Sequence, residues 1–271
     1  MNTAWITGAG GLIGSQIVRL APSSWTARGL TRSDFDLTDF SAVRNAFEHE
    51  GPRLVIHCAA MSKTMECERN PDASRLNNLE VTRVLTELAA DIPLIFFSTD
   101  LVFDGLKGNY SEADVPNPLT VYAEHKLAAE RVVLANPRHT VVRTSLNAGR
   151  TRNGTAFNEQ WRAAWERGET LSLFADEFRS PIAAEVTARA IWELVAANAP
   201  GLYHLAGSER MSRYDIGRTL AKAYHLDAKI ERGSIRDFAG MRRSPDTSLD
   251  CAKIQQLLAF PLPKFSDWLH T

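Results

Sequence analysis

Two side chains near the middle of the chain, Tyr122 and Lys126, have the types and spacing of an acid/base pair. They are four residues apart in a stretch rich in Ala, Leu and Glu, so a helix would place both on one face, one turn apart. A phenol can donate a proton to a reacting oxygen, but its ordinary pKa of about 10 makes it a weak acid near neutral pH. A neighbouring ammonium stabilises the phenolate and lowers that pKa. The pair predicts proton transfer, although a surface Tyr and Lys at this spacing are common in amphipathic helices.

A glycine-rich turn near the N-terminus is the second feature that carries chemistry. Gly8, Gly11 and Gly14 follow a short apolar strand predicted over Thr3–Thr7 and precede a helical pattern. Glycines allow a tight turn and let backbone N–H groups approach a pyrophosphate, to which the helix N-terminus adds a positive dipole. Strand, glycine turn and helix in this order predict a nucleotide-binding site. The alternative is a tight turn with a purely structural role.

The end of the second predicted strand, Trp25–Leu30, bears on the choice of cofactor. An acidic residue at that strand end would bind the adenosine ribose hydroxyls, whereas an arginine suits a 2′-phosphate. Arg32 stands there and favours NADP(H) over NAD(H), with a solvated arginine as the alternative. Asp36, a few residues on, is a candidate acceptor for the adenine amino group.

Two apolar runs predict buried parallel strands whose ends face the same site. Arg53–Ala60 ends in the small residues Cys58, Ala59 and Ala60, which would let a cofactor pass closely. Pro93–Ser98 leads into Thr99 and Asp100, and a hydroxyl at the end of a central strand lies where ligands bind in such sheets. Thr99 could donate a hydrogen bond to a carbonyl oxygen that Tyr122 protonates, or could be a helix cap. Asn77, in a helix predicted over 71–90, could bind backbone or water behind the site, or could lie on the surface.

The bulk composition excludes several classes of protein. The 271 residues include 31 Lys+Arg and 32 Asp+Glu, so no excess charge attracts nucleic acid or an anionic membrane. No apolar run approaches the roughly 20 residues of a membrane span, and we expect no signal peptide. Three scattered cysteines without a CxxC motif favour reduced thiols in a cytoplasmic protein.

The order of predicted strands and helices indicates an α/β fold with a doubly wound parallel Rossmann sheet. Regular alternation loosens after about residue 145. We therefore expect an NAD(P)-binding domain over residues 1–145 and a smaller α/β substrate lobe over residues 146–271, with the chain crossing back between them.

Three motifs follow one another along the chain: the glycine turn, the sequence Ser98-Thr99-Asp100, and the pair Tyr122 and Lys126. In this order the chain resembles the extended short-chain dehydrogenase/reductase superfamily. Within it, the chain is similar to the dTDP-4-dehydrorhamnose reductase family over nearly its whole length. The matching stretches are TGAGGLIGSQ, DFDLTD, VIHCAA, FFSTDLVFDG, YSEADVPNPLTVYAEHKLAAE, VVRTS, LYHLAG and the Arg242–Asp250 tail.

This resemblance implies hydride transfer between NAD(P)H and a 4-keto sugar on a nucleotide. It implies that Tyr122 is the acid, that Lys126 lowers its pKa and holds the nicotinamide ribose, and that Thr99 polarises the carbonyl. Thr99, Asp100 and Tyr122 would then face the substrate. The remaining cofactor contacts implied are the pyrophosphate at Gly8, Gly11, Leu12, Ile13 and Gly14, the adenine at Asp36 and Leu37, the ribose side at Cys58, Ala59 and Ala60, and Arg32. No metal is expected, and a homodimer is a further expectation.

Four departures from the family pattern bear mainly on the substrate. His57-Cys58 stands where the family usually has Asn-Ala, Met65 lies near a common acidic position, and Leu101 replaces a common aromatic residue. Leu146 stands where a Trp usually packs on the sugar, so the identity of the sugar is left open. Two alternatives remain: another extended-family enzyme, such as a nucleotide-sugar epimerase, a dehydratase or another carbonyl reductase, or a regulatory protein that kept the fold. The arginines of the tail could hold phosphate or could be exposed.

Overall fold

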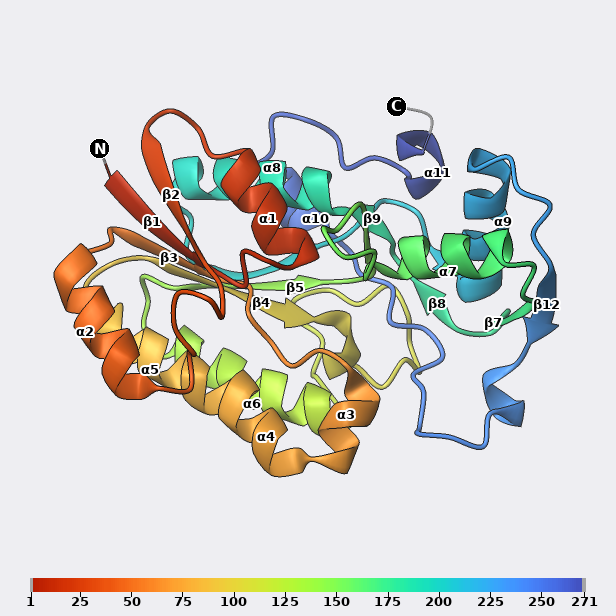
Figure 1. Cartoon of the computed structure of the whole chain (residues 1–271), viewed down its shortest axis with the longest axis horizontal. Helices are drawn as coiled ribbons and strands as arrows, with labels where there is room; N and C mark the ends of the chain where they lie inside the picture. The colour runs from red at the N-terminus through yellow and green to blue at the C-terminus, as the bar shows by residue number, and fades with distance from the viewer. Residues whose placement is uncertain (1, 270–271) are drawn as a thin grey trace.

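The computed structural model describes residues 2–269 and shows helices on both faces of a parallel sheet (Figure 1). The strand order is β10-β5-β4-β3-β1-β2, and every neighbouring pair is parallel. The strands are β1 (Asn2–Thr7), β2 (Trp25–Leu30), β3 (Leu54–His57), β4 (Leu94–Thr99), β5 (Thr140–Thr144) and β10 (Gly201–Leu205). The predicted doubly wound α/β fold is confirmed.

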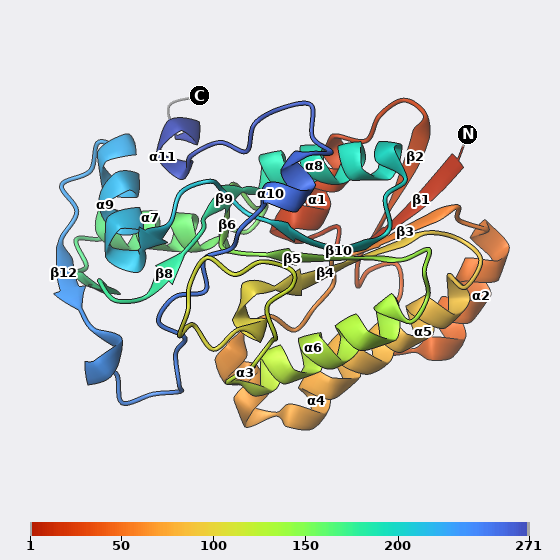
Figure 2. The ribbon, with the colours of Figure 1, turned by 180° about the vertical axis from the view of Figure 1, so that it is seen from behind.

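Two hydrophobic cores, one on each face of the sheet, hold the helices in place. Side chains alternate between the faces along a strand, and in β1 Ile6 packs into one core while Trp5 packs into the other. The helices of the first face are α1 (Leu12–Arg19), α8 (Ala184–Ala197) and α10 (Ala252–Gln255), and those of the second are α2 (Phe40–Glu50), α5 (Val81–Leu88) and α6 (Val121–Leu134) (Figure 2). Burial from both sides explains why β3 and β4 are uninterrupted apolar runs.

The segment between β3 and β4 differs from the single helix predicted over 71–90. It contains α3 (Thr64–Arg69), which the sequence analysis missed, then α4 (Pro71–Arg75), the π-helical turn η1 (Leu76–Glu80) and α5. A π turn inserts an extra residue into a helix and often occurs at functional sites. Here it lies beside the carboxyl end of the sheet, where it turns Asn77 and Asn78 in different directions.

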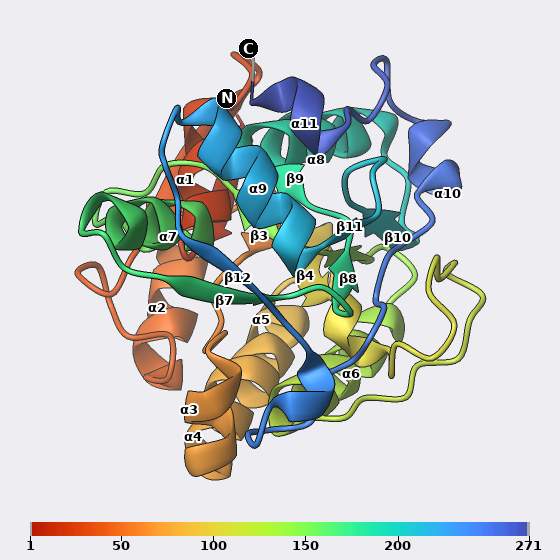
Figure 3. The ribbon, with the colours of Figure 1, turned by 90° about the vertical axis from the view of Figure 1, so that its right-hand side faces the viewer.

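The C-terminal part of the chain builds a second unit around its own hydrophobic core (Figure 3). Its elements are β6 (Asn147–Ala148), α7 (Phe157–Glu166), β7 (Leu171–Phe174), β8 (Phe178–Arg179), β9 (Ile182–Ala183), β11 (Met211–Ser212), α9 (Arg213–Ala223), β12 (Ile230–Gly233), the 3-10 turn η3 (Ile235–Asp237) and α11 (Phe265–Trp268). Between them, α8 and β10 return to the first sheet, so the division at residues 145 and 146 stays a prediction. The segment 176–181 contains the short strand β8, which the sequence analysis did not predict. No helix of residues 2–269 has the length and apolar character to cross a bilayer.

Candidate active site

A cavity of about 580 Å³ opens where the strands of the main sheet reach their carboxyl ends. Strand β1 lies between β2 and β3, so the direction of winding reverses beside it. In open α/β sheets, ligands bind at that switch point. The cavity is lined by every site residue that the sequence predicted: Gly8, Gly11, Leu12, Ile13, Gly14, Arg32, Asp36, Leu37, Cys58, Ala59, Ala60, Thr99, Asp100, Tyr122 and Lys126.

The glycine turn leaves no room for side chains between the ends of β1 and β3. Gly8 has a positive φ of 67°, and a Cβ there would lie 2.7 Å from the backbone nitrogen of Ala59. A Cβ on Gly14 would overlap the carbonyl group of Gly8. Gly11 caps α1 without a side-chain hydrogen bond, so the first N–H groups of the helix have no side-chain acceptor. This cradle fits the pyrophosphate of a dinucleotide.

His57, at the family's Asn position, ties the two strand ends together. Its Nδ1 lies 2.7 Å from Thr7 Oγ1, and its Nε2 lies 3.2 Å from Thr82 Oγ1. Thr7 Oγ1 in turn accepts a hydrogen bond of 3.2 Å from the backbone N–H of Ala59. Burial, helped by the charge of Lys126, lowers the pKa of His57 to about 3, so the ring is neutral. His57 therefore links the ends of β1 and β3 beside the glycine turn through Thr7.

The wall opposite the glycine turn is shaped by the π-helical turn η1. Asn78 is buried and holds the backbone of Met61, accepting from its N–H at 2.9 Å and donating to its carbonyl at 3.0 Å. Asn77 donates to the carbonyl of Ala73 at 2.9 Å and lines the cavity. Asn77 therefore binds backbone, one of the two roles considered from the sequence, and its neighbour Asn78 holds the loop at Met61. Burial raises the pKa of the Cys58 thiol, which remains protonated.

The carboxylates near the end of β2 are already bound by protein groups. Asp36 accepts hydrogen bonds of 2.9 Å from both the N–H and the hydroxyl of Thr38, which lower its pKa. Asp34 accepts from the Thr31 N–H at 2.9 Å and forms an ion pair of 2.9 Å with Arg28. Arg32 is exposed and lines the cavity. This end of the cavity therefore offers an exposed cation, while its two carboxylates are held by protein groups.

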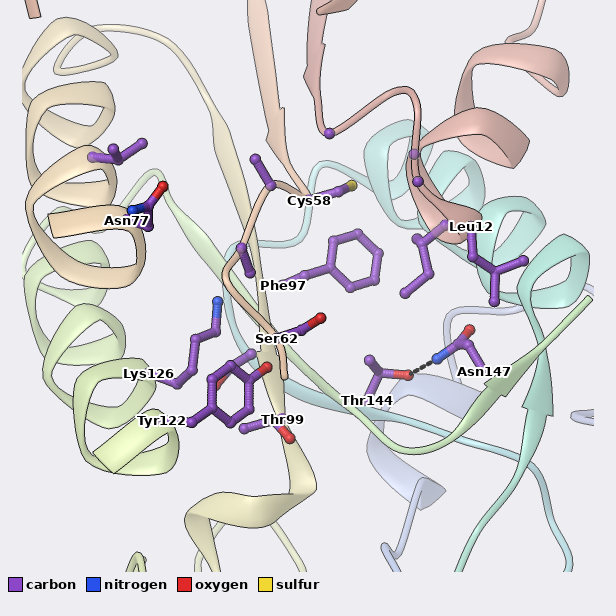
Figure 4. Close-up of a pocket in the computed structure, with 18 of the residues that line it drawn as sticks. Leu12, Cys58, Ser62, Asn77, Phe97, Thr99, Tyr122, Lys126, Thr144 and Asn147 are labelled. Atoms are coloured by element: carbon purple, nitrogen blue, oxygen red, sulfur yellow. Dashed lines mark hydrogen bonds between the residues drawn. The ribbon is translucent and has the colours of Figure 1, made fainter. Parts of the chain in front are cut away.

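Tyr122 and Lys126 project from the first turns of α6 into the other end of the cavity (Figure 4). Thr120 caps this helix by accepting from the N–H of Ala123. Both side chains are buried, at 8% and 2% exposure. The ammonium of Lys126 lies 3.8 Å from the centroid of the Phe96 ring. Burial lowers the pKa of Lys126 to about 7, while the carboxylate of Glu130 acts in the opposite direction.

Several neighbouring groups act on Tyr122. Burial raises the pKa of the phenol, and the carboxylate of Asp100 raises it further. The hydroxyl of Thr99 and the guanidinium of Arg179 lower that pKa. Arg179 is a cation that the sequence analysis did not name, and the effect of Lys126 on the phenol stays a prediction.

Asp100, predicted to face the substrate, is fully buried in the structure. Its carboxylate forms an ion pair of 2.8 Å with Arg179 and accepts hydrogen bonds from Ser145 at 2.7 Å and Thr247 at 3.1 Å. The Thr99 hydroxyl lies 3.3 Å from its other oxygen. With these donors around it, the carboxylate is better placed to organise the site than to bind a substrate.

The sequence analysis missed several residues that line the substrate end. They are Ser62, Phe97, Ser98, Thr144, Ser145, Asn147 and Arg179. Arg179 had no sequence signal, because it lies in a strand of only two residues and reaches the cavity only through the tertiary fold. Leu146, at the family's Trp position, lines the cavity as well.

A smaller cavity of about 60 Å³ adjoins the first and shares Leu101 and Arg179 with it. Arg242 and Arg243 from the tail line it, and Arg243 forms an ion pair of 2.7 Å with Glu177. Within residues 2–269, no group of three or more His, Cys, Asp or Glu side chains is arranged to hold a metal ion.

Comparison with known proteins identifies relatives over the full length of the chain. The family model of the RmlD substrate binding domain matches residues 2–271. The probable low-salt glycan biosynthesis reductase Agl14 of Haloferax volcanii is 30% identical over 97% of this chain and 95% of that protein. A dTDP-4-dehydrorhamnose reductase of Sinorhizobium fredii is 28% identical, over 97% and 93% of the two chains. The methionine adenosyltransferase 2 subunit beta of Danio rerio is also 28% identical, over 93% and 84%.

Solved structures show the same fold. A hypothetical dTDP-4-dehydrorhamnose reductase from Sulfolobus tokodaii superposes with a TM-score of 0.89 at 28% identity, covering 98% of both chains. A dTDP-4-dehydrorhamnose reductase from Bacillus anthracis, solved in complex with NADP, has a TM-score of 0.93 at 23% identity and covers 100% of this chain and 98% of that one. The resemblance predicted from the sequence is thereby confirmed.

Proposed function

Since the chain belongs to the RmlD substrate binding domain family, we propose that it is an NAD(P)H-dependent reductase of a 4-keto sugar carried on a nucleotide. The proposed activity is similar to that of dTDP-4-dehydrorhamnose reductase, as two relatives are named. The observation that carries this proposal is the convergence of Thr99, Tyr122 and Lys126 on the cavity that also holds the glycine turn. An acid, a cation and a hydroxyl donor would thus surround one reacting carbonyl.

The residues of the cofactor end fit a dinucleotide, with NADP(H) favoured over NAD(H). The turn at Gly8, Gly11 and Gly14 and the N-terminus of α1 would hold the pyrophosphate. Lys126 would hold the nicotinamide ribose. Arg32 would bind a 2′-phosphate, since Asp34 is occupied by Thr31 and Arg28 and cannot compete for ribose hydroxyls. The NADP complex of the Bacillus anthracis relative supports this preference.

When bound, NAD(P)H supplies a hydride to the carbonyl carbon and is oxidised to NAD(P)+. The Thr99 hydroxyl donates a hydrogen bond to the carbonyl oxygen, and Tyr122 transfers its proton there. The electron pair of the broken O–H bond stays on the phenolate oxygen. The raised pKa of Tyr122 keeps the phenol protonated at neutral pH, as an acid must be before the reaction.

At the substrate end, the hexose of a nucleotide sugar would lie near Leu146 and Asn147, which line the cavity. A leucine cannot stack on a sugar face as a tryptophan does, so hydrogen bonds from polar side chains would set its orientation instead. A cytoplasmic location, which suits the free thiols of Cys58, Cys67 and Cys251, and a homodimer belong to the same proposal.

The test is to mix the protein with NADPH or NADH and dTDP-4-keto-6-deoxy-L-mannose and to follow the nicotinamide absorbance. We expect oxidation of the cofactor, and we expect Tyr122→Phe to lower turnover by about 10²- to 10⁴-fold without weakening cofactor binding. Oxidation at the wild-type rate in Tyr122→Phe would contradict the proposed acid. Tightly bound cofactor without net oxidation of added NADPH would favour an epimerase or dehydratase. Cofactor binding without any turnover would favour the regulatory alternative, and one relative is named as a subunit beta of methionine adenosyltransferase 2.

A further inference from the structure

A chain of buried hydrogen bonds connects the loop after β3, which lines the cofactor end of the cavity, to the π-helical turn η1. At one end, the backbone N–H of Ala59 donates to Thr7 Oγ1 at 3.2 Å, and Thr7 Oγ1 lies 2.7 Å from His57 Nδ1. At the other end, His57 Nε2 lies 3.2 Å from Thr82 Oγ1, which donates to the carbonyl of Asn78 at 3.0 Å. The four side chains along this path are no more than 1% exposed, so each polar atom depends on its protein partner.

The direction of each hydrogen bond in this chain follows from the chemistry of its members. Thr82 has a single hydroxyl hydrogen, which goes to the carbonyl of Asn78, so its oxygen must accept from His57 Nε2. A neutral imidazole that donates from Nε2 accepts at Nδ1, where the hydroxyl of Thr7 donates. Thr7 Oγ1 in turn accepts from the N–H of Ala59. All four bonds therefore run in one sense, from the loop to the helix, and His57 joins the two halves.

Asn78 also holds the other end of the same loop. Its side chain accepts from the N–H of Met61 at 2.9 Å and donates to the carbonyl of Met61 at 3.0 Å. The loop is therefore attached to η1 at both ends, directly at Met61 and through His57 at Ala59. Its position matters to the glycine turn, since a Cβ on Gly8 would lie only 2.7 Å from the Ala59 nitrogen. A shift of Ala59 would change the width of the cradle.

We propose that His57 is a positioning residue of the cofactor site, which together with Thr82 holds the loop of residues 59–61 at the distance from the glycine turn that a dinucleotide needs. This inference rests on the dinucleotide binding in the proposed function and does not depend on the sugar. His57 itself does not line the cavity and acts through the backbone of Ala59, which does. Both walls of the cofactor end are in this way held to one fixed point on η1.

The experiment compares two threonines of α5 that make the same kind of hydrogen bond. Thr82 and Thr86 both donate to the carbonyl four residues earlier, at 3.0 and 2.7 Å, but of the two only Thr82 also contacts His57. We expect Thr82→Val to weaken NADPH binding about tenfold in a fluorescence titration, because the buried imidazole loses its acceptor. Thr86→Val is the matched control and should bind NADPH as the wild type does.

Variants of His57 and Thr7 test the chain itself. His57→Leu should lose NADPH affinity by about the same factor as Thr82→Val. His57→Asn places an amide near the position of Nδ1, where its oxygen can accept from Thr7, and should bind NADPH more tightly than His57→Leu. In the double variant Thr7→Val/Thr82→Val, the loss should be no greater than in the more affected single variant, because both substitutions break one chain.

Urea unfolding of each variant separates weakened binding from loss of the fold. Unchanged affinity in Thr82→Val, equal losses in Thr82→Val and Thr86→Val, or losses that multiply in the double variant would overturn the role of His57. A wild type without affinity for NADPH or NADH would overturn both this inference and the proposed function. If the affinities follow the expected pattern but no nucleotide sugar is reduced, the proposed reduction fails and the role of His57 stands.

Discussion

Replacing Lys126 by Met should stabilise the protein at the expense of its proposed activity. Lys126 is 2% exposed, and its ammonium packs over Phe96 without an ion pair to any carboxylate of residues 2–269. A buried ammonium is stabilised poorly, which is why its pKa lies at about 7 instead of the ordinary 10.5. Methionine fills a similar volume without a charge to desolvate. Functional sites are where such unfavourable burial is retained.

The size and the pH dependence of the effect follow from that pKa. A displacement from 10.5 to about 7 corresponds to about 5 kcal/mol, at 1.36 kcal/mol for each factor of ten in proton affinity. Below about pH 7 the side chain is charged in both the folded and the unfolded states, so the full cost is present. Between about pH 7 and 10.5 the unfolded chain holds a proton that the folded protein has released, so wild-type stability rises with pH. The gain in Lys126→Met is therefore largest at pH 6 and small near pH 10.

The assay is urea unfolding of the cofactor-free wild type and Lys126→Met at several values between about pH 6 and pH 10. The expected free energy of unfolding is higher in the variant by up to about 5 kcal/mol at the acidic end, and the two curves converge at the alkaline end. The exposed Lys222→Met is the matched control and should run parallel to the wild type. If the free energy of unfolding of Lys126→Met ran parallel to that of the wild type from pH 6 to pH 10, or if the variant were less stable at pH 6, the reasoning would be refuted.

Two further predictions concern the glycine turn and the buried ion pair between Glu130 and Arg143. Gly14→Ala should weaken NADPH binding at least about tenfold in a fluorescence titration, because its Cβ would meet the backbone of Gly8. Gly10→Ala should bind normally, since its nearest neighbour would be a side-chain methyl at 3.8 Å, and equal affinities in the two variants would contradict the cradle. Glu130→Gln should cost about 3–5 kcal/mol in urea unfolding, because it leaves the buried Arg143 without its partner at 2.7 Å. Ser98→Ala removes only a hydrogen bond to the same carboxylate and should cost about 1 kcal/mol, and equal losses would show that the charge is not the cause.

Predictions from local patterns agreed best where an element is long and its burial is regular. Strands β1, β2 and β4 lie within one residue of their predicted bounds, and the helix expected to carry Tyr122 and Lys126 is α6. The strand predicted over Arg53–Ala60 ends at His57, because the small residues after it turn past the glycine cradle.

The elements that the sequence analysis missed are short and depend on distant partners. Strand β8 exists because Met211 and Ser212 pair with it. The π-helical turn η1 gives Asn78 its position against Met61. Neither has enough residues for a periodic pattern, so no window of sequence could reveal them.

The sequence by itself determined which groups share a helix face and which turn can approach a phosphate. Tyr122 and Lys126 are one turn apart in any α-helix, and the glycines permit a conformation that larger residues cannot adopt. Only the tertiary structure decided which distant charges gather at the same end of the cavity. Arg179 arrives from a strand of the other lobe and meets Asp100, while the ammonium of Lys126 lies over Phe96. Electrostatic interactions depend on distance through space and on burial, and neither can be read from spacing along the chain.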